Sequence, residues 1–216
     1  STVWDSAIVL ARALERWVAA DGALPRSVVE LGAGCGLVGI ALAALGAEQV
    51  LLTDLECNLD LLRENARRNS ALWQPRFAPQ VLELAWGVPL PPGTGPFECI
   101  VATDVFYSHE AVAPLARTLS ALAGANTEVL LAAGRNRQAA DAFFAHAAAE
   151  GWAVTLVDRK MRQIATVHET RVWKHPNISP TVSPGLQCIL NVVYVQVLGW
   201  HQGAVFRHMV LVSDPM

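Results

Sequence analysis

The sequence has few charged residues, and neither sign is in large excess. Only 16% of its 216 residues are Asp, Glu, Lys or Arg, and the formal net charge is -3. The positive field with which many proteins attract nucleic acid is absent, so we expect no nucleic-acid partner. Hydrophobic residues make up 53% of the chain. This composition favours a large buried core, as in a parallel sheet covered by helices on both faces.

Paired cysteines and long apolar runs are also absent. The four cysteines contain no C-x-x-C pair: Cys35, Cys57, Cys99 and Cys188. A disulfide framework and a metal site are therefore not expected, and a reducing compartment is the default. Polar or charged residues interrupt every long apolar stretch, and no signal peptide opens the chain. We expect a cytoplasmic monomer without a membrane partner, with the nucleus as the alternative compartment.

A glycine-rich loop between two apolar runs is the most informative feature present. The run Ser27–Leu31 contains Glu30 and leads directly into Gly32-Ala33-Gly34-Cys35-Gly36, and a second run, Gln49–Thr53, ends in Asp54. An α/β domain uses this arrangement to hold a nucleoside-containing cofactor, with the acidic residue on the ribose. A tight turn in an ordinary βαβ unit is the alternative. The predicted cofactor-binding residues of this stretch are Gly32, Ala33, Gly34 and Asp54.

The glycine spacing favours one cofactor. A dinucleotide-binding loop reads G-x-G-x-x-G, and its third glycine lets the helix pack close to the strand. That position is Leu37 here, and glycines stand instead at 32, 34, 36 and 39. This G-x-G-x-G after a carboxylate resembles the first motif of the seven-strand S-adenosylmethionine (AdoMet) methyltransferases. On this interpretation Glu30 either holds the loop or bonds the methionyl amine of the cofactor.

Strands and helices are predicted to alternate through the first three quarters of the chain. The strands are expected at 27–31, 49–53, 80–84, 97–102, 128–133 and 152–157. The helices are expected at 3–20, 37–45, 55–69, 110–122 and 136–150. This pattern predicts an α/β fold with a doubly wound, mostly parallel, Rossmann-like sheet. Right-handed crossovers would bring four residues that follow strands to one sheet edge: Gly32, Asp54, Trp86 and Asp104.

The chain from Thr166 onward has another pattern. The stretch contains proline turns at 176, 180 and 184 and lacks the periodicity of a helix or strand, and Cys188–Leu198 is then a β-prone run. We predict a methyltransferase domain over residues 1–165 and an irregular C-terminal extension over 166–216. The β-prone run would supply a last, antiparallel strand or belong to a poorly packed extension.

Three more motifs occur in a familiar order around the glycine loop. Val3-Trp4-Asp5-Ser6-Ala7 precedes a helix, Leu84-Ala85-Trp86 follows the third predicted strand, and Asp104-Val105-Phe106-Tyr107 follows the fourth. Together they resemble methyltransferase family 16, the seven-strand protein-lysine methyltransferases, over about residues 3–160. The opening motif is most similar to the branch acting on Hsp70-type chaperones and valosin-containing protein. The resemblance also implies an N-terminal truncation, because the family carries a β-rich segment before Trp4.

The resemblance implies cofactor contacts outside the glycine loop. Trp4 would line the cofactor pocket, although it also suits the hydrophobic start of a helix. Trp86 would flank the adenine, since a flat apolar ring suits a flat base; plain core packing is the alternative. Thr103 would lie near the adenine, where the family usually has alanine or serine.

The resemblance places the chemistry at the D-x-x-Y motif. Asp104 would recruit and orient the target ammonium, while Tyr107 and Phe106 would form aromatic walls that attract a methylated cation. The alternative for Asp104 is an N-cap of the next helix, a role for which Ser108 competes. We therefore expect an AdoMet-dependent methyltransferase acting on a lysine of a protein such as a chaperone or an AAA-type ATPase. A small-molecule methyltransferase of the same fold and a non-catalytic, methyltransferase-like binding protein are the alternatives.

Overall fold

The structure is a computed structural model that describes residues 3–20, 22–133, 139–149, 152, 155–157, 194–196 and 208–212. The helices are α1 (Asp5–Ala19), α2 (Leu37–Leu45), α3 (Glu56–Arg68), α4 (Val112–Leu122) and α5 (Ala140–Ala149), with short 3-10 turns η1 (Ser70–Leu72) and η2 (Pro75–Phe77). The strands are β1 (Ser27–Leu31), β2 (Gln49–Asp54), β3 (Gln80–Glu83), β4 (Phe97–Thr103), β5 (Ala123–Ala132), β6 (Thr155–Val157), β7 (Tyr194–Gln196) and β8 (His208–Val212).

The strands form one mixed sheet that is mostly parallel, in the order β3-β2-β1-β4-β5-β8-β6-β7. The predicted α/β class and doubly wound order are confirmed, because the chain runs outward from β1 to β3 and then returns through β4 to the other side. The seven-strand sheet that the family resemblance implies is not what the structure shows. Within the described residues, five parallel strands form the main sheet and three short strands extend it beyond β5.

The extension beyond β5 was predicted in part. Tyr194–Gln196 falls within the predicted β-prone run and pairs antiparallel with β6. Strand β8 lies between β5 and β6, is parallel to both, and was not predicted from the sequence. The rest of Cys188–Leu198 and the proline turns at 176, 180 and 184 lie outside the described residues.

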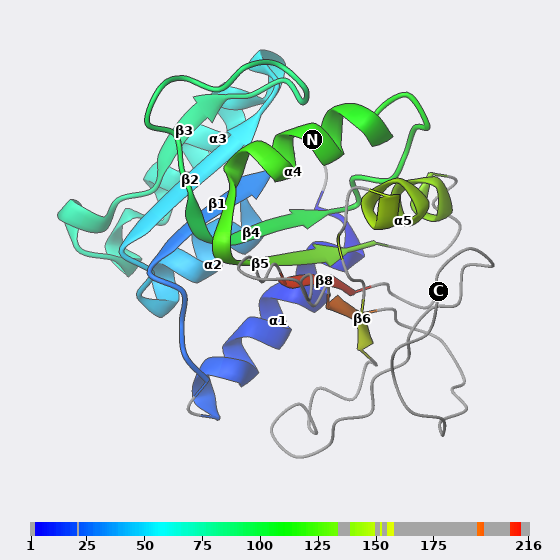
Figure 1. Cartoon of the computed structure of the whole chain (residues 1–216). Helices are drawn as coiled ribbons and strands as arrows, with labels where there is room; N and C mark the ends of the chain where they lie inside the picture. Colours follow the sequence, from blue (N-terminus) through cyan, green and yellow to red (C-terminus); the bar gives the residue numbers. More distant parts are fainter. Residues whose placement is uncertain are drawn as a thin grey trace.

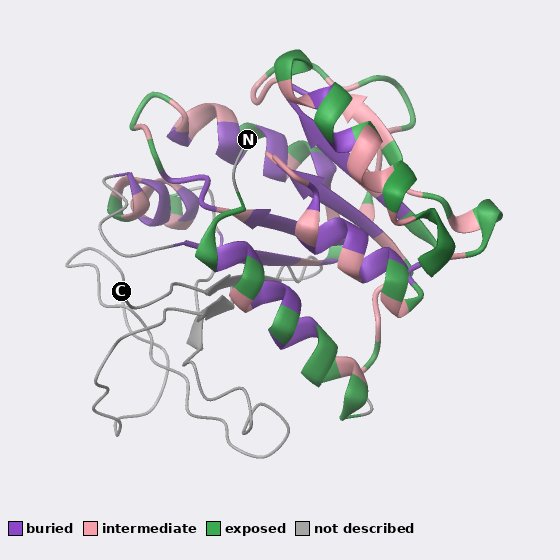
Figure 2. Cartoon of the chain, turned by 180° about the vertical axis from the view of Figure 1, so that it is seen from behind, coloured by how far each residue is buried: buried purple, intermediate pink, exposed green. Residues whose placement is uncertain are grey.

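Helices cover both faces of the central strands (Figure 1). One apolar cluster joins α1, α2 and α3 to the sheet, and the other joins α4 and α5 to the opposite face. Alternation along β4 supplies both clusters, since Val101 faces the first and Ile100 the second. Figure 2 shows the central strands largely buried and the helices buried along one side, whereas the edge strand β3 has no buried residue. Each fully buried Leu or Ile side chain contributes about 1.5–3 kcal/mol to folding.

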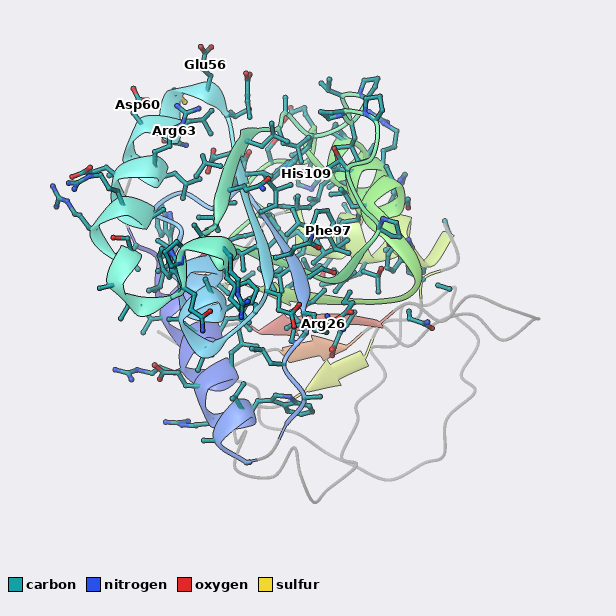
Figure 3. All side chains as sticks on the ribbon, turned by 90° about the vertical axis from the view of Figure 1, so that its left-hand side faces the viewer. Arg26, Glu56, Asp60, Arg63, Phe97 and His109 are labelled. Carbon is teal, nitrogen blue, oxygen red and sulfur yellow. The ribbon has the colours of Figure 1, made fainter. Side chains whose placement is uncertain are left out.

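The outer faces of the helices carry the charges. Figure 3 shows Glu56, Asp60 and Arg63 projecting away from the sheet along α3, and Arg63 pairs with Asp60 at 3.2 Å. Such exposed pairs contribute little to stability.

In the described part of the chain, no helix combines the length and apolarity needed to cross a membrane.

Strand β5 begins five residues before the predicted start, although Gly124 and Asn126 are typical of a turn. The reason is tertiary pairing. Ala123 pairs with Phe97 across a register shift. The Thr127 hydroxyl donates to the Phe97 carbonyl at 2.5 Å and accepts from the Gly124 N–H at 2.7 Å. These contacts hold an irregular strand start that local propensity does not indicate.

Candidate active site at the carboxyl edge of the sheet

All nine predicted site residues line one cavity of about 770 Å³ at the carboxyl edge of β1, β2, β3 and β4. They are Trp4, Gly32, Ala33, Gly34, Asp54, Trp86, Thr103, Asp104 and Tyr107. The parallel register explains the convergence, because Leu31, Thr53 and Ala102 are aligned across β1, β2 and β4. The residue that follows each strand therefore reaches the same edge, where open α/β sheets bind ligands. The volume lies within the usual range for small-molecule sites.

The glycine loop approaches the cavity with its backbone. Gly32 and Gly34 have φ angles of +63° and +57°, a left-handed conformation that favours glycine. A Cβ atom added to Gly32 would lie 3.0 Å from Cζ2 of Trp86. The missing side chain therefore permits both the turn and the close approach of the Trp86 ring.

Asp54 holds the loop from the neighbouring strand. Its Oδ2 accepts from the Gly34 N–H at 2.6 Å, and its Oδ1 accepts from the Leu55 N–H at 2.7 Å and the Asn58 amide at 2.9 Å. Asp54 is 8% exposed and lines the cavity. An ionised carboxylate has about four acceptor positions, so these bonds leave capacity for a ligand hydroxyl.

Glu30 lies behind the loop rather than in the cavity lining. Its Oε2 accepts from the Gly39 N–H at 2.8 Å, and the side chain is 1% exposed. These contacts fit the interpretation in which Glu30 holds the loop, and they also tie the loop to helix α2. The pKa of Glu30 is raised to about 8, and burial is the largest cause. The hydrogen bond from the Gly39 N–H lowers the pKa, and the nearby charge of Asp54 raises it further.

The third glycine of a dinucleotide loop has a counterpart two residues later in this chain. A Cβ atom on Gly39 would lie 2.2 Å from Cδ2 of Leu52 and 2.7 Å from Oε2 of Glu30. Gly39 therefore lets α2 pack closely on β2, which is the packing task that the dinucleotide motif assigns to its third glycine.

Aromatic side chains surround the mouth of the cavity. Trp4 is the N-cap residue of α1 and is 56% exposed, while Tyr107 is 60% exposed. The Trp86 and Tyr107 rings lie 6.0 Å apart at 38°. Desolvation, followed by the Asp54 charge, raises the pKa of the Tyr107 phenol. Phe106 was expected to join this wall, and that prediction is wrong: it is 1% exposed and packs 4.8 Å from the Phe143 ring, centroid to centroid.

Asp104 lies at the turn that follows β4. Its φ of +57° is unusual for a residue with a side chain, and its N–H donates to the Ala132 carbonyl at 2.7 Å. The Ser6 hydroxyl donates to its Oδ2. The N-cap alternative is wrong for both Asp104 and Ser108, because α4 begins at Val112 with Ala111 as its N-cap. The residue with this unusual backbone conformation also lines the cavity.

Sequence reasoning missed the polar side chains that support the loop and the motif. Ser6 bonds Asp104, Asn58 bonds Asp54, and the Asn65 amide donates to the Cys35 carbonyl at 2.9 Å. Asn58 and Asn65 stand on the loop-facing side of a helix that was predicted correctly, so helical periodicity from Asp54 could have indicated Asn58. No local signal links Ser6 to a residue 98 positions away.

The charge of the cavity lining has one sign. Its charged residues are Asp54, Asp104 and Glu110, and no Lys, Arg or His is among the lining residues that the structure describes. Such a lining attracts cationic ligands. Among the described residues, no group of three or more His, Cys, Asp or Glu side chains is arranged to hold a metal ion.

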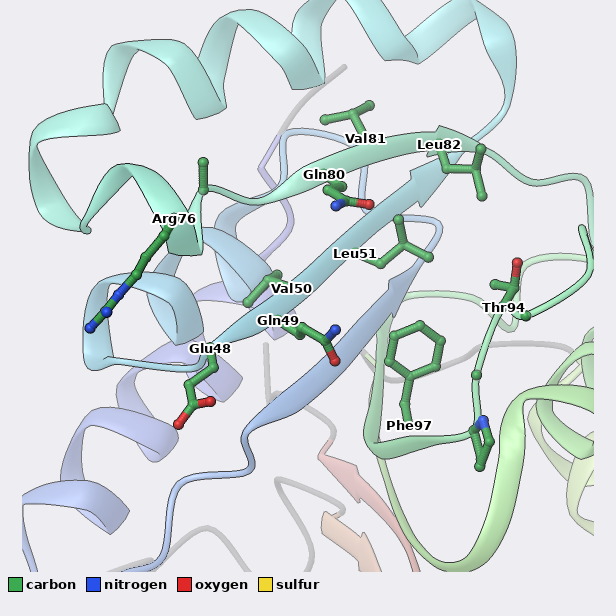
Figure 4. A pocket seen from close by; sticks show the side chains of 14 residues that line it. Glu48, Gln49, Val50, Leu51, Arg76, Gln80, Val81, Leu82, Thr94 and Phe97 are labelled. Atoms are coloured by element: carbon green, nitrogen blue, oxygen red, sulfur yellow. The ribbon is translucent and has the colours of Figure 1, made fainter.

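A second cavity, of about 620 Å³, lies at the opposite ends of β2 and β3, next to the loop before β4 (Figure 4). Gln49, Gln80 and Phe97 line it, together with Glu48 and Arg76. It contains none of the predicted site residues. Since ligands of open α/β sheets bind at the carboxyl ends of the strands, the first cavity is the candidate active site.

Three curated relatives are between 33% and 41% identical to this chain. Mouse protein-lysine methyltransferase METTL21E is 39% identical over 134 residues, which are 60% of this chain and 54% of the relative. Mouse protein N-lysine methyltransferase METTL21A is 41% identical over 135 residues, 61% of this chain and 59% of the relative. Xenopus tropicalis EEF1A lysine methyltransferase 3 is 33% identical over 129 residues, 60% of this chain and 55% of the relative. The chain thus spans less than two thirds of the length of each.

A solved structure and a family model also match this chain. Ribosomal protein L11 methylase of Lactobacillus delbrueckii subsp. bulgaricus matches with a TM-score of 0.51 and 20% identity, over 69% of this chain and 70% of that one. This match confirms the Rossmann-like fold. The family model described as lysine methyltransferase, methyltransferase family 16, matches residues 1–150. The predicted resemblance is therefore confirmed, and the chain belongs to the lysine methyltransferase family.

Proposed function

We propose that this protein is an AdoMet-dependent protein-lysine N-methyltransferase. The observation that carries the proposal is the gathering of the glycine loop, Asp54 and Asp104 around one acidic, aromatic-rimmed cavity. Membership of the family and the names of METTL21E and METTL21A as lysine methyltransferases support it.

The loop side of the cavity fits a nucleoside-containing cation. Gly32 and Gly34 offer backbone without side chains, and Asp54 offers carboxylate oxygens for ribose hydroxyls. Trp86 and Trp4 offer aromatic surface, and the acidic lining suits a sulfonium. Bound AdoMet supplies a methyl carbon whose bond to sulfur breaks as its bond to the acceptor nitrogen forms. We propose cofactor roles for Trp4, Gly32, Ala33, Gly34, Asp54, Trp86 and Thr103.

The part of the cavity around Asp104 fits an ammonium group. Asp104 is 8% exposed and lines the cavity, so its carboxylate can recruit a lysine side chain and fix its direction. Methyl transfer needs the neutral amine, whereas lysine has an ordinary pKa of ~10.4. A carboxylate raises that pKa, so Asp104 orients the group, and the apolar surroundings of Tyr107 and Trp86 favour release of the proton to solvent.

The acceptor and the cellular context are proposals that rest on the relatives and on the opening motif. A Xenopus relative is named for the elongation factor EEF1A, and the Val3-Trp4-Asp5 motif resembles the branch acting on a chaperone or an AAA-type ATPase. We propose a protein acceptor from one of these classes and a monomeric enzyme of the cytoplasm, with the nucleus as the alternative. The division into a methyltransferase domain at 1–165 and an extension at 166–216 stays a prediction.

The proposal is tested in two steps. Thermal unfolding is first measured with AdoMet and with its demethylated product, and each is expected to raise the melting temperature through binding to the native state. Tritiated AdoMet is then incubated with the protein and with recombinant EEF1A, an Hsp70-type chaperone and valosin-containing protein, and with a methylation-deficient extract. Mass spectrometry of the labelled band is expected to find a methylated lysine.

The outcomes separate the alternatives. If neither compound shifts the melting temperature, the assignment of AdoMet as the cofactor is wrong. A shift without protein labelling would favour a non-catalytic binding protein, and labelling only of small molecules would favour a small-molecule methyltransferase.

A further inference from the structure

The first turn of α1 is tied to the acceptor side of the cavity by one buried side-chain hydrogen bond. The Ser6 hydroxyl donates to Oδ2 of Asp104 across 98 positions of sequence. Ser6 is 1% exposed and Asp104 is 8% exposed. A hydroxyl directed at a carboxylate in such surroundings is a charge-assisted bond, which is stronger than a neutral one.

Two elements thus hold Asp104 from opposite ends. The backbone is fixed by the bond from its N–H to the Ala132 carbonyl of β5, and the side chain is fixed by Ser6 of α1. The N-terminal end of α1 also carries the positive end of the helix dipole, which stabilises a negative charge placed there. The position of the carboxylate therefore depends on α1 as well as on the D-x-x-Y turn.

We propose that Ser6 is a positioning residue that fixes the Asp104 carboxylate for acceptor recognition. This inference rests on the proposed function, because it assigns a role to Ser6 only if Asp104 receives a cationic acceptor. A carboxylate accepts about four hydrogen bonds. The Ser6 bond occupies one of these positions and restricts rotation of the group, so that the remaining oxygen lone pairs keep one direction in the cavity.

The same helical turn then contributes to the cofactor-binding part and to the acceptor-binding part of the cavity. Trp4, two residues before Ser6, lines the cavity, and Ala7 N–H closes the turn on the Trp4 carbonyl at 3.0 Å. Because Trp4 and Ser6 belong to one hydrogen-bonded helical turn, the backbone that carries the aromatic surface for the cofactor is joined to the backbone that carries the hydroxyl for Asp104. Alignment of donor and acceptor is the main task of an enzyme for an in-line transfer.

The variants Ser6→Ala and Ser6→Thr test the proposal. Ser6→Ala removes the hydroxyl, and Ser6→Thr retains it. Thr127→Val is the matched control, because it removes a hydroxyl that is equally buried at the other end of the sheet. For each variant we would measure the melting temperature, the AdoMet dissociation constant, and kcat and KM for the protein acceptor that the wild type labels among those tested above.

We expect Ser6→Ala to raise KM for the acceptor about tenfold, which corresponds to about 1.4 kcal/mol. The AdoMet dissociation constant is expected to change less than twofold, and Ser6→Thr should recover most of the loss. Unchanged acceptor kinetics in Ser6→Ala would overturn the proposal. An equal loss in Thr127→Val would also overturn it, because the effect would then reflect stability alone.

A crystal structure of Ser6→Ala tests the inference independently of turnover. We expect the Asp104 carboxylate to adopt another rotamer or to become disordered. An Asp104 carboxylate that keeps its wild-type position would contradict the positioning role of Ser6, whether or not the wild type labels an acceptor. A wild type that labels no acceptor would instead count against the proposed function.

Discussion

The side chain of Asp54 and the backbone of Gly34 are joined by a hydrogen bond of 2.6 Å across 20 positions of sequence. The other oxygen of the same carboxylate accepts from Leu55 and Asn58 at the start of α3. One buried side chain therefore links the glycine loop, the end of β2 and the following helix. Asp54 shapes the loop in addition to its proposed contact with the ribose of the cofactor.

Replacing Asp54 is expected to affect stability and cofactor binding together. Asp54→Ala leaves the Gly34 and Leu55 N–H groups without this acceptor, and each charge-assisted bond is worth about 1.5–3 kcal/mol. We expect a melting temperature several degrees lower and an AdoMet dissociation constant at least tenfold higher, measured by calorimetry. Asp60→Ala, which removes a fully exposed aspartate of α3, is the control and should change neither. Wild-type AdoMet affinity in Asp54→Ala would contradict the assignment.

Glu30 predicts an unusual dependence of stability on pH. Its pKa is raised to about 8 in the native state from an ordinary 4.5, chiefly by burial. Between these values the native state retains a proton that the unfolded chain releases. The contribution of this group is therefore fully present below pH 4.5 and is lost as the pH rises through 8.

Glu30→Gln is expected to remove this dependence, because the amide stays neutral and its oxygen can still accept from the Gly39 N–H. The wild type should lose on the order of a few kcal/mol of stability between pH 5 and 8 relative to the variant. Denaturant unfolding at four pH values measures the difference. The control Glu15→Gln, on the exposed side of α1, should retain the wild-type profile. Parallel profiles for Glu30→Gln and the wild type would show that Glu30 is not protonated in the native state.

Gly39 is predicted to be intolerant of alanine despite its helical position. Helix propensity alone favours alanine over glycine by about 1 kcal/mol. The added Cβ atom would lie 2.2 Å from the Leu52 side chain, which is fully buried, and would crowd Glu30. We expect Gly39→Ala to destabilise the protein by about 1–3 kcal/mol. A less-than-additive effect in combination with Leu52→Ala would confirm the contact, and a more stable Gly39→Ala would refute it.

Phe106 and Tyr107 are neighbours in sequence with opposite expected effects. Phe106 is buried against Phe143 and Phe144, so Phe106→Ala should cost about 3–5 kcal/mol of stability. Tyr107 is mostly exposed at the cavity mouth, so Tyr107→Ala should cost less than about 1.5 kcal/mol. The loss of cation–π attraction should instead lower kcat/KM for the acceptor about 3- to 30-fold. The reverse pattern would exchange the roles of the two residues.

The central part of the fold could be predicted from the sequence because its signals are local. Ser27–Leu31 and Gln49–Thr53 are apolar runs bounded by glycine and aspartate, and strands with both faces buried have this appearance. Once the strands were placed, the shared edge followed from topology, and the cavity-lining positions of Gly32, Asp54 and Asp104 followed from the edge.

The remaining features depend on contacts between distant segments. Strand β8 forms by pairing with β5, and no local pattern specifies that partner. The start of β5 needs Phe97 and Thr127, and the orientation of Asp104 needs Ser6. The sequence could not indicate which of Phe106 and Tyr107 is buried, because both are aromatic residues that suit an apolar pocket. The burial of Phe106 depends on its packing against α5.

The most direct test of the account is methyl transfer by Asp104→Ala. Wild-type protein and variant are incubated with tritiated AdoMet and the acceptor panel, and labelled lysine is quantified by mass spectrometry alongside the AdoMet dissociation constant. We predict labelled lysine with the wild type, loss of labelling in Asp104→Ala, and AdoMet affinity that is largely retained. Equal lysine labelling by the variant and the wild type would contradict the role assigned to Asp104 in this cavity.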